Sequence, residues 1–234
     1  MSGSAEVRRG LRAGVPIALG YLPVAVTYGL LARQAGLSPL EVTGMSLLVY
    51  AGASQFMAVK MLAASLPVAQ IVLAAFILNF RHFLMSASLS QSLKPVPRRP
   101  ALLAYWVTDE SFVTGSLSLG QEGFTSTSFL AMAALAYVAW ATGSLAGALF
   151  GALIPAGLAS AMGVGLYALF IALLVPSLKT NWRGAAVAGL AAAVSLALWL
   201  AFPRFAEGWR IILATLGASA CGLALPRRRE EARQ

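Results

Sequence analysis

The stretch Asn79-Phe80-Arg81-His82 places an asparagine and two ionisable side chains inside an apolar run at about 68–91. That run is long enough to cross a bilayer, which takes about 20 residues. A second polar stretch, Thr108-Asp109-Glu110-Ser111, lies in another apolar run about thirty residues later. Because a charge at the bilayer centre costs roughly 2.5–3.5 kcal/mol, such residues usually face the interior of a helix bundle. The four ionisable groups either pair for structure or line a path for a polar solute or a proton, and their number favours the path.

The composition is that of a membrane protein. Of the 234 residues, 59% are hydrophobic and 11% are charged, whereas a typical soluble domain carries about 25% charged residues. The mean hydropathy is +0.79. With helices of about 20 residues and short loops, the chain has room for seven or eight spans. We therefore expect an all-α, polytopic membrane protein with seven or eight transmembrane helices.

The net charge is +9, and several of the basic residues flank the apolar part of the chain: Arg8, Arg9 and Arg12 precede the first apolar run, and Arg227, Arg228, Arg229 and Arg233 follow the last one. Basic residues in these places are typical of cytoplasmic anchors, and no basic face interleaved with aromatic residues suggests nucleic-acid binding. The sequence contains no HExxH motif, recognisable nucleophile motif or nucleotide-binding loop, so we expect neither an enzyme nor a bound metal or cofactor. The predicted parts are a basic tail at 1–12, one transmembrane domain at 13–226 and a basic tail at 227–234.

The first apolar segment, about 13–32, contains two prolines and two glycines. Proline removes a backbone donor and clashes with the carbonyl group four residues before it, so Pro16 and Pro23 argue against a continuous helix. Irregular backbone at membrane depth is tolerated only where protein buries it or water reaches it. The segment therefore has either a simple proline kink or a functional break near Tyr21-Leu22-Pro23.

The second segment, about 40–64, contains the run Tyr50-Ala51-Gly52-Ala53-Ser54-Gln55-Phe56. Ser46, Tyr50 and Ser54 recur every four residues and therefore share one face of a helix. Gly52 and its alanine neighbours are small enough to let a substrate or a neighbouring backbone approach closely. This face is either part of the path or a packing surface.

In the third segment, Asn79, His82, Ser86 and Ser90 form one continuous polar face. Arg81 points about 100° away from His82 on an ideal helix, so we expect these two side chains to meet different partners. The fourth segment, at about 101–119, is the most polar one.

The fifth segment, about 127–153, contains Gly143, Gly147 and Gly151 at four-residue intervals. This spacing predicts close packing against another helix. The remaining apolar segments, at about 158–177, 184–202 and 209–225, carry no signal of a site.

A shift of 87 residues superposes 36–56 on 123–143, with Tyr50 on Tyr137. We interpret this weak match as an internal repeat of three segments. Because three is odd, the second copy must be inverted, as in many secondary transporters, where substrate binds near the midplane between broken helices. The predicted parts are copies at about 13–95 and 101–180 and two extra helices at about 184–225.

Eight crossings with a cytoplasmic N-terminus would leave Lys94, Arg98 and Arg99 on the outer side, against the positive-inside rule. Either this loop is an exception, or one of the first three segments is re-entrant and does not cross. The sequence leaves both possibilities open.

Four pieces of the chain occur together in a set order: GVPIALGYLPVAVTYG (14–29), GLSPLEVTGMSLLVYAGASQF (36–56), FRHFLM (80–85) with SL at 88–89, and TDESF (108–112). In these pieces the chain resembles the AzlC family of bacterial branched-chain amino acid exporters. After about residue 115 only the hydrophobic pattern is similar. Asn79 departs from the family pattern, in which an acidic residue stands two places before the Arg-His pair, and this weakens any coupling role for an acid at that point.

The resemblance implies a multi-pass protein of the bacterial cytoplasmic (inner) membrane that exports branched-chain amino acids or related small solutes. It also implies a small AzlD-type membrane subunit as a partner, besides the lipid bilayer and the amino acid substrate. The Gly143–Gly151 seam, or the plain segments at 184–202 and 209–225, would be the docking face.

A zwitterionic amino acid needs a cation for its carboxylate, an acceptor for its ammonium group and an apolar pocket. Arg81 or the freed amides of Gly52–Ser54 can supply the first, since helix N-termini attract anions. Asp109 or Glu110 can supply the second. A proton is the simplest driver, with His82, Asp109 or Glu110 as its carrier, because burial brings such groups towards a protonation change near neutral pH. The predicted path residues are Tyr21, Pro23, Tyr50, Gly52, Ser54, Gln55, Asn79, Arg81, His82, Asp109 and Glu110.

Two other functions use the same residues. A passive channel or facilitator would share the path without coupling, and accumulation against a gradient would distinguish it. A structural subunit, whose partner holds the site, would bind no ligand by itself.

Overall fold

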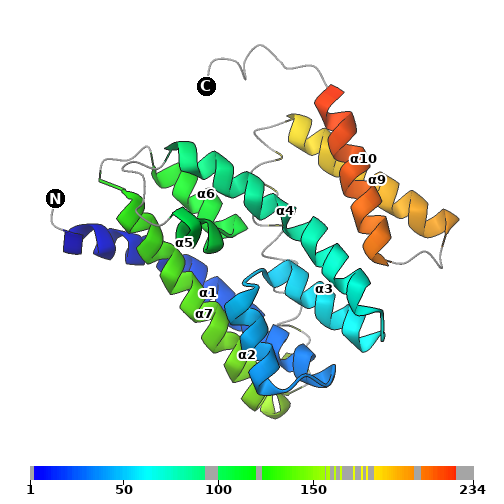
Figure 1. The fold of residues 1–234 in the computed structure, drawn as a ribbon, viewed down its shortest axis with the longest axis horizontal. Coiled ribbons are helices and arrows are strands. Elements are labelled where there is room, and N and C mark those ends of the chain that lie inside the picture. The colour runs from blue at the N-terminus through cyan, green and yellow to red at the C-terminus, as the bar shows by residue number, and fades with distance from the viewer. Residues whose placement is uncertain are drawn as a thin grey trace. The chain divides into compact units, whose positions relative to one another are not determined.

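The computed structural model describes residues 3–92, 100–119, 123–155, 182–202 and 207–224, together with isolated positions between 157 and 178. Every regular element in these ranges is a helix, which confirms the all-α prediction (Figure 1). The chain divides into two compact units, Met1–Leu169 and Phe170–Gln234, and each is described by itself.

Four helices in the described ranges are long and apolar enough to cross a membrane. They are α1 (Gly3–Gln34), α4 (Val68–Ser92), α7 (Ser126–Phe150, continued by the 3-10 turn η1, Gly151–Leu153) and α9 (Trp182–Ala201). In the C-terminal unit, α10 (Glu207–Ala224) packs against α9. The predicted segment at 158–177 lies mostly outside the described residues, so seven or eight spans stay a prediction.

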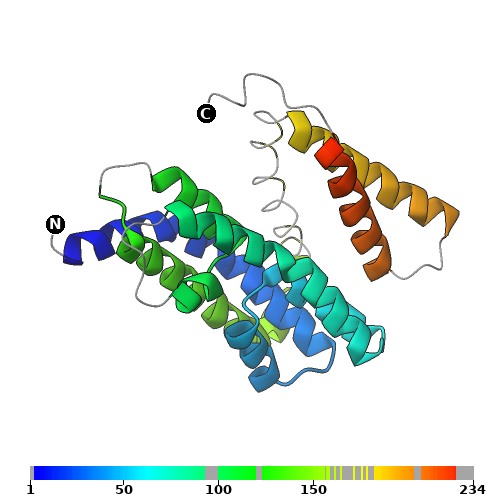
Figure 2. The same cartoon turned by 45° about the horizontal axis from the view of Figure 1, so that its top comes forward.

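Helix α1 runs without interruption through Pro16 and Pro23, so the break considered near Tyr21 is absent. The Thr27 hydroxyl donates to the Pro23 carbonyl oxygen at 3.0 Å, which adds a side-chain bond within this part of the helix. Helix α1 also lies along α7 in both views (Figures 1 and 2). Membrane helices tolerate proline where neighbouring helices and hydroxyl side chains stabilise the interrupted backbone.

The contact between α1 and α7 depends on glycines from both helices. A Cβ at Gly143 would lie 2.8 Å from Ala25 Cβ, and one at Gly151 would lie 2.9 Å from Leu30 Cβ. A Cβ at Gly147 would collide with the backbone of Val26. In the structure these three glycines lie directly against α1. Since α1 already occupies the seam, the suggestion that a partner subunit docks there was wrong.

Replacing Gly147 by valine should therefore destabilise the N-terminal unit. The added carbons meet backbone atoms of α1, which have no rotamer to escape to, and overpacking of this kind costs about 1–3 kcal/mol. We expect a lower thermal unfolding midpoint in detergent than for the wild type. Gly20→Val is the matched control, because a Cβ at Gly20 has no atom within 4 Å. Equal midpoints for the two variants would contradict the close contact at Gly147.

The second predicted segment is divided into α2 (Pro39–Leu48) and α3 (Gly52–Ala63). A capping box between Ser38 and Glu41 begins α2, and no side-chain hydrogen bond caps the start of α3. Between the two helices, Tyr50 adopts φ +45°, a left-handed conformation that is uncommon for a residue other than glycine. The half-helix start that we expected at Gly52–Ser54 is therefore present.

Helices α2 and α3 enter and leave the unit at the same end. In α2, Ser46 contacts Ser144, and Tyr50, just beyond its end, packs against Tyr137, so α2 runs antiparallel to α7. Helix α3 then returns in the direction of α1. Gly52 lies against Trp140, which packs on Tyr21, whereas Phe56 packs on Tyr28, about two turns further along α1. The pair α2–α3 thus forms a helix hairpin whose beginning and end lie at the same end of the unit.

The fourth predicted segment is also divided, into α5 (Pro100–Tyr105) and α6 (Asp109–Ser118). Before it, α4 begins beside the end of α3 and runs back until Leu89 lies near Gly115. The α5–α6 break lies beside Tyr21, since Thr108 contacts that residue. A Cβ at Gly115 would lie 2.7 Å from Phe129 at the start of α7. The pair α5–α6 therefore enters and leaves at the opposite end from α2–α3.

Two residue pairs that the 87-residue shift superposes are in contact. The Tyr21 hydroxyl lies 2.9 Å from Thr108 Oγ1, and the ring centroids of Tyr50 and Tyr137 are 4.9 Å apart. Residues near a two-fold axis meet their own equivalents, as an inverted repeat requires. The same shift, however, superposes the broken α2–α3 on the continuous α7, and the repeat stays a prediction.

Candidate functional site

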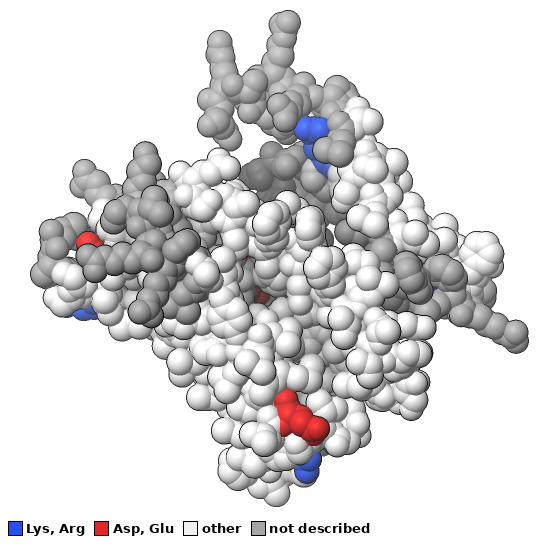
Figure 3. All heavy atoms as spheres, in the orientation of Figure 1, with Lys and Arg blue, Asp and Glu red and all other residues white. Residues whose placement is uncertain are grey.

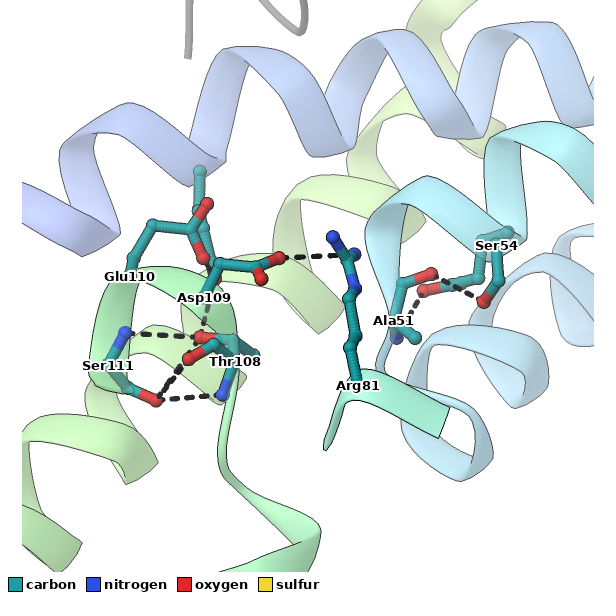
Figure 4. A network of polar contacts seen from close by, with 9 residues as sticks. Ala51, Ser54, Arg81, Thr108, Asp109, Glu110 and Ser111 are labelled. Atoms are coloured by element: carbon teal, nitrogen blue, oxygen red, sulfur yellow. Dashed lines mark hydrogen bonds and ion pairs between the residues drawn. The ribbon is translucent and has the colours of Figure 1, made fainter. Parts of the chain in front are cut away.

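An ion pair joins the two polar stretches of the sequence. Arg81 Nη2 of α4 lies 3.1 Å from Asp109 Oδ2 in the first turn of α6, and both side chains are partly exposed, by 33% and 25%. Figure 4 shows the Arg81 guanidinium between this turn and the start of α3, where Ala51 and Ser54 lie. The side chain therefore stands between the two helix breaks. On the face drawn in Figure 3, the charged side chains of the described residues form only a few small, separate patches.

The sequence Thr108-Asp109-Glu110-Ser111 is first of all a helix start. Thr108 caps α6, because its hydroxyl accepts from Ser111 N–H at 3.3 Å and its own N–H donates to Ser111 Oγ at 2.8 Å. Asp109 and Glu110 then occupy the first turn, where the helix dipole stabilises negative charge. The cap fixes the direction in which both carboxylates leave the helix.

Glu110 points towards α1 and not towards a cation. Its Oε2 accepts a hydrogen bond from the Tyr21 hydroxyl. In the part of the chain that the structure describes, the ion pair of Arg81 with Asp109 is the one within 4.0 Å, so no described cationic side chain neutralises Glu110. Two adjacent acids thus have different surroundings: Asp109 is neutralised, whereas Glu110 is held by a neutral donor.

Tyr50 adds an unusual hydroxyl to this group. The residue is only 3% exposed, and its hydroxyl has no hydrogen-bond partner among the described residues. It lies within electrostatic range of both Glu110 and Tyr21. A buried unpaired hydroxyl is costly, and together with the left-handed backbone it marks a constrained position of the kind found at binding sites.

Two tyrosines that were not among the predicted path residues, Tyr105 and Tyr137, hold the break in α2–α3. The carbonyl oxygen of Leu47 accepts hydrogen bonds from the Tyr137 hydroxyl at 2.8 Å and from the Tyr105 hydroxyl. The ring of Tyr137 also packs against Trp106, with centroids 5.7 Å apart. The end of α2 is thereby attached to α5 and α7. The superposition of Tyr50 on Tyr137 was the sequence signal that marked this position.

Gln55 belongs to a closed network of hydrogen bonds inside the unit. Its Oε1 accepts from Trp140 Nε1 at 3.0 Å and its Nε2 donates to Ser46 Oγ at 3.0 Å. Ser46 Oγ donates to Ser144 Oγ at 2.8 Å, and Ser144 Oγ donates to the carbonyl oxygen of Trp140 at 2.7 Å. Both polar atoms of the Gln55 side chain, Oε1 and Nε2, therefore have hydrogen-bond partners within the protein. Gln55 therefore positions the break.

Ser54 and Gly52 are also involved in the local structure of the break. The Ser54 hydroxyl donates to the Ala51 carbonyl oxygen at 2.9 Å. A Cβ at Gly52 would lie 2.8 Å from the Trp140 ring, so only glycine fits there without displacement. Both residues keep the start of α3 close to α7.

The remaining predicted path residues lie at the edge of this group. Asn79 Oδ1 is buried without a hydrogen-bond partner among the described residues. His82 lies within electrostatic range of Arg81 and Asp109. Pro23 lies two residues beyond Tyr21 in the continuous α1. The structure thus brings Tyr21, Tyr50, Arg81, Asp109 and Glu110 together between the two breaks.

The sequence of the chain matches the model of one known protein family. The model of the AzlC protein family matches residues 16–154, from the middle of α1 to just beyond the end of α7. A membrane protein of Archaeoglobus fulgidus is 38% identical, over 97% of this chain and 95% of the relative. No solved structure matches the chain.

Two further relatives have more informative names. The inner membrane protein YgaZ of Escherichia coli is 32% identical over 82% of each chain. The branched-chain amino acid transport protein AzlC of Bacillus subtilis is 22% identical, over 77% of this chain and 72% of the relative. Residues 16–154, which the family model matches, include both helix breaks and the ion pair between them. The chain therefore belongs to the AzlC family, whose members are membrane proteins related to branched-chain amino acid transport.

Proposed function

We propose that this chain is a secondary transporter that exports branched-chain or related small amino acids across the bacterial cytoplasmic membrane, driven by protons. The observation that carries the proposal is the meeting of two broken helices from opposite ends at Tyr21, beside the pair of Arg81 and Asp109. Broken helices that meet inside a membrane domain are the usual binding sites of secondary transporters. The family relation supports the substrate class.

The helix directions support a definite topology. We propose six crossings, formed by α1, α4, α7, the segment near 158–177, α9 and α10, with α2–α3 and α5–α6 as re-entrant pairs. The end of α4 then lies on the cytoplasmic side with the start of α1. Twelve of the seventeen Lys and Arg residues fall on that side, whereas Arg33, Lys60, Arg204 and Arg210 fall towards the other, and this excess agrees with the positive-inside rule. The twelve are Arg8, Arg9 and Arg12, then Lys94, Arg98 and Arg99, then Lys179 and Arg183, and finally Arg227, Arg228, Arg229 and Arg233.

The carboxylate and the ammonium group of a zwitterionic amino acid fit two different parts of the proposed site. Arg81 is already paired with Asp109, so the uncapped start of α3 at Gly52–Ser54 is the better site for the substrate carboxylate. Glu110, which no described cation neutralises, is the better site for the ammonium group. Apolar side chains of α1 and α7 surround both.

A small AzlD-type subunit is the proposed partner. The glycine seam of α7 is occupied by α1, which leaves the C-terminal unit as the docking region. No described residue of α9 is buried in the structure. A second membrane subunit beside α9 would cover this apolar surface.

The test is an export panel in cells that lack the native exporter, with and without a co-expressed small subunit. Cells are loaded with dipeptides that release leucine, isoleucine, valine, methionine or, as a control, lysine. We expect faster efflux of the branched-chain residues, abolished by a protonophore. Efflux that persists with the protonophore and never exceeds the outside concentration would establish a passive facilitator. No efflux of any solute, alone or with the subunit, would overturn the proposal.

A further inference from the structure

The hydrogen-bonding groups around the Glu110 carboxylate suggest how substrate and proton are exchanged. The Tyr21 hydroxyl donates to the carboxylate, the Thr108 side chain and the Glu110 backbone also hydrogen-bond to it, and the buried Tyr50 hydroxyl nearby has no partner among the described residues. A carboxylate that no described cation neutralises, in a mostly apolar unit, is satisfied in two ways: by a proton of its own, or by a cation from outside.

A primary ammonium group is the kind of cation that fits the hydrogen-bond acceptors of Glu110 and Tyr50. It carries three N–H donors, and the Glu110 carboxylate and the Tyr50 phenol oxygen can both accept from it. A ligand carboxylate is disfavoured at the same point, because Glu110 would repel it. Aromatic rings line the group as well: the centroid of Tyr21 is 5.4 Å from that of Trp140, and Tyr50 packs on Tyr137. Ring faces favour a cation over an anion.

We infer that Glu110 is a single site that holds either a proton or the ammonium group of the substrate, with the Tyr50 hydroxyl as the second acceptor of the ammonium group. This inference rests on the proposed transport function and adds its coupling step. The two ligands exclude each other, since one carboxylate cannot be protonated and neutralise an ammonium group at once. Each substrate that binds then displaces one proton, and each proton that binds releases one substrate.

The exchange balances without any further reactant. When the ammonium group binds, the O–H bond of the Glu110 carboxyl group breaks and the proton passes to water, while no covalent bond to the substrate forms. From the outer side the reverse step protonates Glu110 and frees the amino acid. One amino acid leaves the cell for each proton that enters.

Other groups around Glu110 contribute charge but are engaged differently. Asp109 is neutralised by Arg81, and His82 lies within electrostatic range of that pair. The titratable and charged groups from the elements packed around the site are Tyr21 of α1, Tyr50 of the α2–α3 break, Arg81 and His82 of α4, Tyr105 of α5, Asp109 of α6 and Tyr137 of α7.

Proton counting on the full-length chain in weakly buffered detergent tests the inference without transport. The probes are L-leucine, 3-methylbutylamine, which lacks the carboxylate, and 4-methylpentanoate, which lacks the amine. At a pH low enough for Glu110 to be protonated before the ligand binds, we expect about one proton to be released per leucine or amine bound, and none with the acid. Below the pH at which Glu110 becomes protonated, the apparent Kd for leucine should rise about tenfold for each pH unit. Leucine binding with no proton release, or with a Kd independent of pH, would overturn the inference and leave the transport function intact.

Two variants and a control separate the roles of the residues. Glu110→Gln should release no proton with any probe. Tyr50→Phe should still release one, but bind leucine and the amine about fivefold to tenfold more weakly, the effect of one lost hydrogen bond. Glu41→Gln changes an exposed acid outside the site, in the capping box of α2, and should match the wild type. Proton release by Glu110→Gln equal to that of the wild type would assign the exchange to another group and overturn the inference.

Discussion

Arg81→Ala and Asp109→Asn should each reduce amino acid efflux from loaded vesicles to the background rate, with membrane insertion unchanged. The two side chains form the ion pair that holds the first turn of α6 to α4. Removing either partner leaves the other charge without its counter-ion in a poorly hydrated position, where it attracts the substrate's opposite charge or distorts the turn. The orientation of Glu110, the next residue, depends on the same turn.

The measurement is the initial rate of leucine efflux, normalised to the amount of inserted protein. Arg33→Ala is the matched control for the loss of a positive charge. Arg33 is exposed at the end of α1 and donates to the Leu37 carbonyl oxygen at 2.7 Å, outside the site. We expect it to transport like the wild type. Wild-type rates in both Arg81→Ala and Asp109→Asn would remove this pair from the mechanism.

The hydrophobic pattern of the sequence predicted the long continuous helices of this fold, but it did not predict where the helices break. The third segment, expected at about 68–91, is α4 at Val68–Ser92. In α1 two prolines suggested an interruption that contact with α7 prevents, whereas α2–α3 breaks at Tyr50 without any proline. The helix-breaking tendency of proline therefore pointed to the wrong place for a break. Packing against neighbouring helices decides which backbone irregularities are tolerated in lipid.

The break between α5 and α6 had a signal in the sequence, but the apolar residues around it make that signal easy to overlook. Thr108 followed by Ser111 is a capping pattern, and a cap inside an apolar run indicates that a new helix begins there. By contrast, Tyr105 and Tyr137 looked like ordinary apolar positions, because their hydroxyl contacts to Leu47 depend on how distant segments meet. The polar residues of a membrane site can thus be named from sequence, but their partners cannot.

Single-cysteine labelling should give opposite results for the two ends of α4. In the proposed topology α2–α3 is re-entrant, so Ala64, at the end of α3, faces the outside and Gln91, near the end of α4, faces the cytoplasm. With eight full crossings the two positions would exchange sides. The labelling pattern distinguishes the two topologies, because a membrane-impermeant maleimide reaches only the outer side of the membrane in intact cells.

The experiment uses a Cys221→Ser background, since Cys221 is exposed on α10 and would itself react. We expect Ala64→Cys to be labelled in intact cells and Gln91→Cys only after permeabilisation. Both positions are exposed in the structure, so a cysteine at either one is accessible from its own side. Labelling of Gln91→Cys but not Ala64→Cys in intact cells would make α2–α3 a full crossing. The cytoplasmic basic groups would then lie on both sides of the membrane, and the meeting of two re-entrant breaks would lose its basis as a transport site.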